Sequence, residues 1–215
     1  MNVLKIDKKR IRRTLYWFAA ELLVLAIVLI LLVYKPKGYE AVVPDTSGRV
    51  SKYLTHELGQ EFYNKAQLGE PFELVVEEAG LNDIIVTGEW VMPQTEARAS
   101  LPVVRFVPGK MIVMASAWLS EMEFVATIEI TANADEAGRP GLSVHSVKVG
   151  AVPVTLAAKA VAKKMYNEQI SELPPEHIAV QLAASLFDGH PFEPVLDAGG
   201  KLVKISKIEV DEGKA

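Results

Sequence analysis

The spacing of apolar and polar positions changes several times along the chain. Residues 15–34 are apolar or aromatic at every position except Glu21. At about 1.5 Å of rise per residue, a helix over this run spans about 30 Å, the thickness of the hydrocarbon core of a bilayer. A helix that is apolar on all sides is unusual in a soluble domain. The pattern therefore predicts a transmembrane helix over residues 15–34.

Shorter segments with regular spacing follow this run. Helical spacing predicts helices over residues 48–67, 79–85, 153–171 and 176–187. Apolar runs bounded by turns predict strands over residues 71–77, 101–107, 111–119, 121–132 and 142–149, and a final hairpin of 192–196 and 202–210 with a bulge near Ser206. This order of elements predicts an α+β fold, in which an antiparallel β-meander packs against long helices. We divide the chain into a tail (1–14), an anchor (15–34), a linker (35–47) and an α+β domain (48–215).

Charge is distributed unequally between these parts. The tail carries six lysines and arginines against Asp7 alone, so the positive-inside rule places it in the cytoplasm and the domain outside. Residues 38–215 hold 15 basic and 25 acidic residues, a net charge of −10. Such a surface repels nucleic acid and anionic lipid headgroups, and we expect no nucleic-acid partner.

Two questions about the apolar run stay open at this point. A cleaved signal peptide is the closest alternative to an uncleaved signal anchor. Its apolar part is normally shorter and ends at small residues, whereas residues 29–34 are bulky, which favours the anchor. Glu21 either lies hydrated near the cytoplasmic interface or pairs with another span.

Motifs for catalysis or metal binding are weak. The chain has no cysteine, which excludes disulfides and thiol chemistry. His56 and Glu57 begin like a zinc-protease helix, but Gln60 stands where the second histidine ligand is needed. Glu77 and Glu78 are adjacent on a predicted strand and would point to opposite faces. We therefore predict that the protein is not an enzyme and uses no metal and no cofactor.

The strand over residues 121–132 shows the clearest alternation. Its apolar positions share one face, whereas Glu123, Thr127, Glu129 and Thr131 are expected to form a face exposed to water. Together with neighbouring elements, the apolar face would enclose an elongated groove for an apolar ligand. The candidate lining is Tyr53, Leu54, Leu58, Phe62, Met111, Val113, Phe124, Ala126, Ile128, Ile130, Val154, Ala157, Val161 and Met165. The same spacing fits an ordinary filled core, and periodicity does not separate the two.

Two stretches of the sequence resemble a known family. Residues 72–85 (FELVVEEAGLNDII) are similar to a strand followed by an acidic–Leu–Asn helix start. Residues 144–155 (VHSVKVGAVPVT) are similar to a strand, a Gly-x-Val-Pro turn and a helix, although Thr155 replaces a second proline. With the β-meander between them, the layout looks like the YpmS-like family of single-pass bacterial envelope proteins.

That resemblance implies a tubular lipid-binding (TULIP-like) fold with a groove for acyl chains. It also implies the bacterial inner (cytoplasmic) membrane as the location, and it carries over no catalytic residues. The leading hypothesis is a non-enzymatic, membrane-anchored extracytoplasmic domain that binds lipid or another apolar ligand. The alternative is a structural or assembly protein that docks on envelope proteins through its acidic domain and its anchor.

Overall fold

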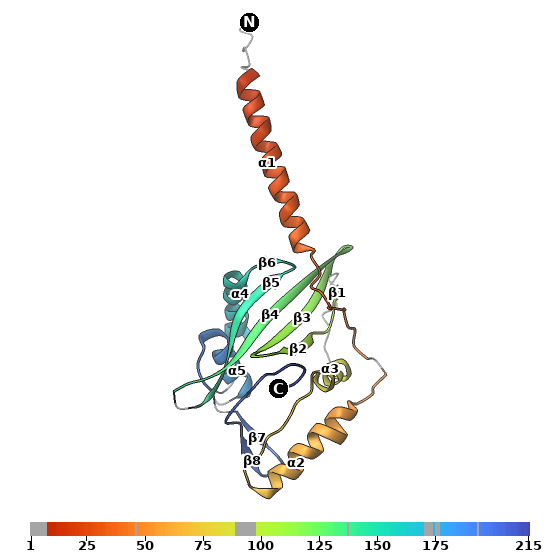
Figure 1. The fold of residues 1–215 in the computed structure, drawn as a ribbon, viewed down its shortest axis with the longest axis vertical. Coiled ribbons are helices and arrows are strands. Elements are labelled where there is room, and N and C mark those ends of the chain that lie inside the picture. Colours follow the sequence, from red (N-terminus) through yellow and green to blue (C-terminus); the bar gives the residue numbers. More distant parts are fainter. Residues whose placement is uncertain are drawn as a thin grey trace.

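The computed structural model describes residues 8–45, 47–88, 98–136, 138–169, 174, 177–192 and 194–215. A long N-terminal helix leads away from a domain built of a sheet and shorter helices (Figure 1). In chain order, the elements are α1 (Lys8–Leu32), the π-helical turns η1 (Tyr53–Leu58), α2 (Gly59–Leu68), α3 (Glu78–Thr87), β1 (Arg98–Ala99), β2 (Val103–Val107), β3 (Lys110–Leu119), β4 (Met122–Ala134), β5 (Pro140–Val149), β6 (Val152–Pro153), α4 (Thr155–Gln169), α5 (Ile178–Asp188), β7 (Val195–Asp197) and β8 (Leu202–Lys204).

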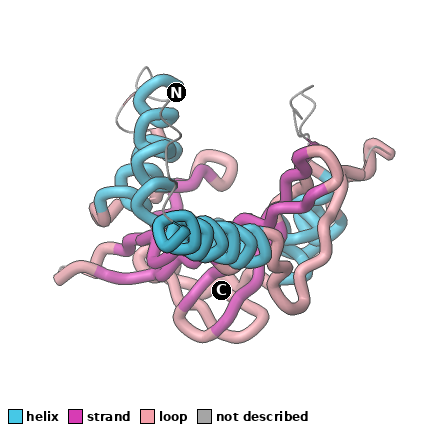
Figure 2. The backbone as a smooth tube through the Cα atoms, turned by 90° about the horizontal axis from the view of Figure 1, so that it is seen from above, coloured by secondary structure: helices cyan, strands magenta, loops and turns pink. Residues whose placement is uncertain are grey.

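The main sheet has six strands in the order β1-β3-β4-β5-β6, and β2 also pairs with β3. All of these pairs are antiparallel. Helices stand at both sides of the strands when the molecule is seen from above (Figure 2). The predicted α+β fold with an antiparallel meander is confirmed. The final hairpin is also present, as a separate two-stranded sheet of β7 and β8.

Two predicted details of the strands are wrong. Residues 71–77 form no ladder; their pairing is limited to an isolated bridge between Glu77 and Lys214, beside which Val76 and Ala215 exchange backbone hydrogen bonds of 2.7 and 2.9 Å. The expected bulge near Ser206 is absent, since β8 ends at Lys204. The register instead shifts between β4 and β5, where His145 is the extra residue.

Side chains from helices close both edges of the sheet. At the β2 edge, Asn82 of α3 accepts from the Val104 amide (2.8 Å) and donates to the Val104 carbonyl (2.7 Å). At the β5 edge, Ser185 of α5 accepts from the Leu142 amide (2.8 Å) and donates to the Leu142 carbonyl (3.1 Å). Thr155, the first residue of α4, accepts a hydrogen bond from the amide of Val147 on β5 (2.9 Å). Backbone groups that a further strand would otherwise pair with are thereby satisfied.

The segment predicted as a linker contributes to the core of the domain. Tyr39 is 3% exposed and packs in a cluster with Met114 and Val125. Its hydroxyl group lies 2.9 Å from the Ser100 hydroxyl. The chain that leaves α1 is therefore fixed to the sheet within a few residues.

Candidate apolar binding face

The sheet positions of the predicted lining lie on one face of the main sheet. The register places Phe124 opposite Ala117, and directly opposed residues of antiparallel strands share a face. On the same face, the register pairs Ala126 with Ala115, Ile128 with Val113 and Ile130 with Met111. Phe124, Ala126 and Ile128 are half-buried, whereas Ile130 is only 8% exposed. The face is thus closed near Ile130 and more open toward the β3–β4 hairpin.

The opposite face is not the wet face that alternation predicted. Val125 is 2% exposed and Thr127 is 9% exposed. The reason is Tyr39, which packs on this face against Val125 and Met114. No strand pattern could indicate that cover, because Tyr39 precedes β4 by more than eighty residues.

Glu129 is the charged group set deepest into this second face. Its carboxylate accepts hydrogen bonds from Lys148 (2.8 Å) on β5 and Lys110 (3.3 Å) on β3. The hydrogen bond from Lys148 is the main reason why the pKa of Glu129 falls to about 2, against the opposing effect of burial. Lys110 and Lys148 reach the single Glu129 carboxylate from the strands on either side of β4, so these contacts link three strands.

A second cluster of charges joins the chain before η1 to α3. Hydrogen bonds from Ser47, with the ion pair to Arg49, lower the pKa of Asp45 to about 2. Arg49 also contacts Asp83 of α3 at 3.1 Å, and Asp83 accepts a hydrogen bond from Ser51. These contacts hold η1 beside α3.

The predicted lining residues of η1 and α2 pack mainly against α3 and its approach. Tyr53 is 9% exposed, and its hydroxyl group accepts from the Glu77 amide at 2.8 Å. The ring of Phe62 meets Phe72 edge to face, with 6.2 Å between centroids. Leu58 is half-buried and Leu54 is exposed. The structure does not bring these four side chains together with β4 as one lining.

The lining predicted from α4 points mostly to solvent. Val154, just before the helix, is half-buried, but Ala157, Val161 and Met165 are exposed. The half-buried positions of α4 include Ala158, Ala162 and Tyr166, and Tyr166 meets Phe187 of α5 edge to face at 6.3 Å. The inward stripe is therefore one residue out of phase with the prediction. Alanines on several sides of α4 make more than one stripe compatible with the sequence.

Several residues that position this site carry no clear signal in the sequence. Ser185 is fully buried and closes the β5 edge. A single serine in an apolar helix does not change the predicted hydrophobic face, so the sequence does not indicate this role. Tyr39 is an aromatic residue between charged positions, which is a weak hint that the chain after α1 belongs to the core.

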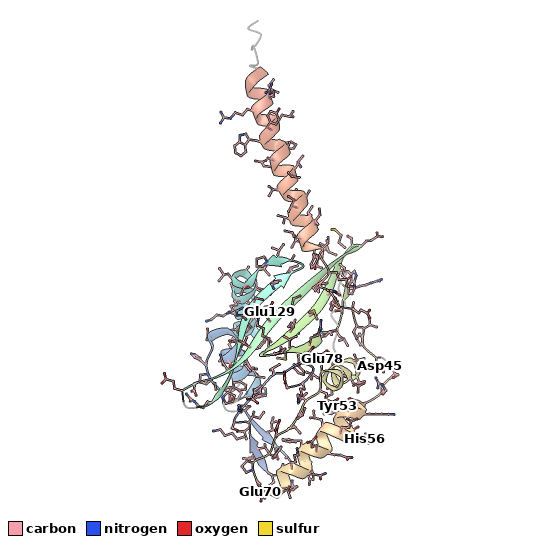
Figure 3. All side chains as sticks on the ribbon, viewed as in Figure 1. Asp45, Tyr53, His56, Glu70, Glu78 and Glu129 are labelled. Carbon is pink, nitrogen blue, oxygen red and sulfur yellow. The ribbon has the colours of Figure 1, made fainter. Side chains whose placement is uncertain are left out.

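Within the described ranges, no group of three or more histidine, cysteine, aspartate and glutamate side chains could hold a metal ion. His56 is exposed, and its ring Nδ1 lies 2.7 Å from the Thr55 hydroxyl. It lies on η1, well away from Glu129 on the sheet (Figure 3).

No family model, no curated protein and no solved structure matches the chain. Among the described residues, one stretch of α1, Ile11–Leu32, is long and apolar enough to cross a membrane. The side chains of residues 11–31 are all exposed. Such a helix fits a signal anchor or a signal sequence.

Proposed function

We propose that the protein is a single-pass membrane protein whose extracytoplasmic domain binds a lipid or another apolar ligand without catalysing a reaction. The observation that carries this proposal is the half-buried apolar face formed by Phe124, Ala126 and Ile128 in the middle of the main sheet. Central strands normally have such side chains covered by packing. A face left partly open offers apolar surface to a ligand.

The position of this face favours a ligand from the membrane. Glu123, next to Phe124, forms an ion pair of 3.5 Å with Lys35, three residues after the end of α1. The open part of the face therefore begins close to the end of the apolar helix. Ala115, Ala117 and Ala126 keep the side chains on this part of the face small, which favours an extended apolar ligand such as an acyl chain.

The exposure of α1 supports an anchor rather than a core helix. A soluble helix of this composition would be buried, whereas the side chains of residues 11–31 are all exposed. The basic tail supports a cytoplasmic N-terminus. The resemblance to the YpmS-like family adds the bacterial cytoplasmic membrane and a TULIP-like lipid-binding role to this proposal.

Photolabelling of the full chain tests the ligand face. The chain is purified in non-ionic detergent and irradiated with a fatty acid that carries a diazirine, and the labelled peptides are mapped by mass spectrometry. We expect saturable labelling within residues 124–128 that unlabelled fatty acid displaces. Ala126→Trp places a large side chain over this part of the face and should lower this labelling several-fold.

A matched variant guards against a general effect of tryptophan. Leu202→Trp changes an exposed side chain of β8 and should leave the labelling unchanged. Labelling that is not saturable, or that is confined to α1, contradicts the proposed ligand face.

The exposed side of α4 supports the second candidate, a structural or assembly protein. Val161 and Met165 are 59% and 51% exposed on one side of a helix, which suits docking of a protein partner. Photoreactive amino acids at these two positions in membranes should then trap a stoichiometric partner. Loss of that partner in Glu21→Leu would assign the contact between spans to Glu21.

A further inference from the structure

The end of α1 is built into the domain. The amide of Ala151, in the turn between β5 and β6, donates to the carbonyl of Leu31 at 2.8 Å. The neighbouring Gly150 lies so close that a Cβ there would be 2.3 Å from the same oxygen. Lys35 adds the ion pair with Glu123 and lies 5.7 Å from the centre of the Tyr39 ring. The direction of α1 therefore determines which end of the domain faces a membrane.

Three segments of the domain lie at that end. Figure 1 shows the tip of the β3–β4 hairpin, β6 and the start of α4 on the side from which α1 leaves. The contact of Ala151 with Leu31 places the β5–β6 turn at the last helical turn of the apolar stretch. The hairpin tip, residues 119–122, directly precedes Glu123 and its ion pair with Lys35.

These segments present large apolar side chains to the outside. Leu119 and Met122 pair across the hairpin tip and are 64% and 48% exposed. Leu156, in the first turn of α4, is 87% exposed. Exposure alone does not distinguish them, because Leu68 and Leu202 at the other end of the domain are also exposed. What distinguishes Leu119, Met122 and Leu156 is that their segments lie at the end of the domain from which α1 leaves.

We propose that this end of the domain rests on the bilayer, with Leu119, Met122 and Leu156 inserted among the lipid headgroups and the upper acyl chains. The proposal rests on the proposed function in one respect, the assignment of α1 as a membrane span. Apolar side chains gain by leaving water for this region, whereas exposed Glu121 stays at the headgroup level. A domain held this way has the open end of its apolar face at the lipid surface.

Spin labelling tests the contact, since the chain has no cysteine and each introduced cysteine is the sole attachment site. Leu119→Cys and Leu156→Cys variants of the full chain are labelled with a nitroxide and placed in phosphatidylcholine nanodiscs. Leu68→Cys and Leu202→Cys are matched controls with exposed leucines at the far end, and Leu25→Cys reports on α1. Collision of each label with oxygen and with a water-soluble nickel chelate is then measured.

We expect the ratio of oxygen to nickel collision at positions 119 and 156 to exceed that at positions 68 and 202 several-fold. A lipid-facing label at position 25, with labels at 119 and 156 as exposed to nickel as the controls, overturns this proposal and leaves the span intact. A nickel-exposed label at position 25 overturns the span itself. Labels at 119 and 156 shielded from both reagents indicate a protein partner or a second copy, and also overturn the bilayer contact. A lipid-facing label at only one of positions 119 and 156 also overturns the proposed bilayer contact.

Discussion

The ring of Tyr53 occupies the space that a side chain at position 80 would need. A Cβ built on Gly80 would lie 2.3 Å from the Cδ1 and Cε1 atoms of Tyr53. The tyrosine is buried, and its hydroxyl group receives a hydrogen bond from the Glu77 amide just before α3. One glycine in a helix thus lets η1 approach α3.

This contact predicts an unusual result for Gly80→Ala. Replacing glycine by alanine inside a helix ordinarily stabilises it by about 1 kcal/mol. Here the added methyl group meets the Tyr53 ring, and overpacking of this kind costs about 1–3 kcal/mol. We expect a lower melting temperature for the full chain in detergent, measured by circular dichroism.

The Tyr53→Leu background provides the control for that prediction. With a smaller side chain at position 53, Gly80→Ala should become neutral or stabilising. If Gly80→Ala lowers the melting temperature equally in both backgrounds, the clash with the ring is not the cause.

Ser185→Ala should destabilise the domain although it removes a single oxygen atom. The hydroxyl group pairs with both backbone groups of Leu142, and the serine is fully buried. Leaving buried backbone groups unpaired costs about 1–3 kcal/mol. Ser206→Ala, at an exposed position, should change stability by no more than about 0.5 kcal/mol. Equal unfolding midpoints of the two variants in urea would refute the role of Ser185 at the edge.

Stability should depend on pH through Glu129. Its pKa is lowered from 4.5 to about 2 in the folded state, so its carboxylate contributes stability above pH 4.5 that is lost as pH falls toward 2. Glu129→Gln should therefore be less stable than the natural chain at pH 7, by about 1 kcal/mol after solvent screening is allowed for. The two melting curves should converge near pH 2.

Lys148→Met should reproduce most of this effect, since Lys148 provides the main hydrogen bond to the carboxylate. A stability difference between Glu129→Gln and the natural chain that stays constant from pH 7 to pH 2 would show that packing, not charge, is responsible.

Gly150→Ala should loosen the contact between the domain and α1. Gly150 has a φ angle of 57°, and its added methyl group would meet the carbonyl oxygens of Leu31 and Leu32. We expect faster hydrogen exchange at the Ala151 amide. Gly48→Ala is the matched control, because Gly48 has a φ angle of 72° but open space around its Cβ position. It carries only the strain of the left-handed backbone, about 1–2 kcal/mol, and should leave Ala151 unchanged.

The elements with strong local patterns were predictable from the sequence. The run of residues 15–34 and the strands predicted over 101–107, 111–119, 121–132 and 142–149 depend on the spacing and turn residues within or next to each segment. The observed bounds of α3, Glu78–Thr87, also agree closely with the helix predicted over residues 79–85. In each case, neighbouring residues alone determine the structure.

The predictions that were wrong concern features that depend on contacts between distant segments. Tyr39 covers a face of β4 that alternation assigned to water, and residues 71–77 lack a partner strand long enough to form a ladder. The phase of α4 is a different case, since Ala157 and Ala158 are chemically equal and only packing against α5 and β5 separates them. The predicted groove combined helix and sheet residues. Periodicity within each segment does not determine whether such distant residues come together.

The side chains from helices that hydrogen-bond to the sheet edges matter where many copies of the chain lie close together. If α1 spans a membrane as proposed, copies of the chain meet in two dimensions, at a far higher local concentration than in solution. Open strand edges under those conditions would recruit each other and grow into aggregates. With Asn82 on one edge of the main sheet and Ser185 and Thr155 on the other, backbone groups of Val104, Leu142 and Val147 that could start such growth are occupied. Dense packing of many copies then becomes compatible with each domain staying separate.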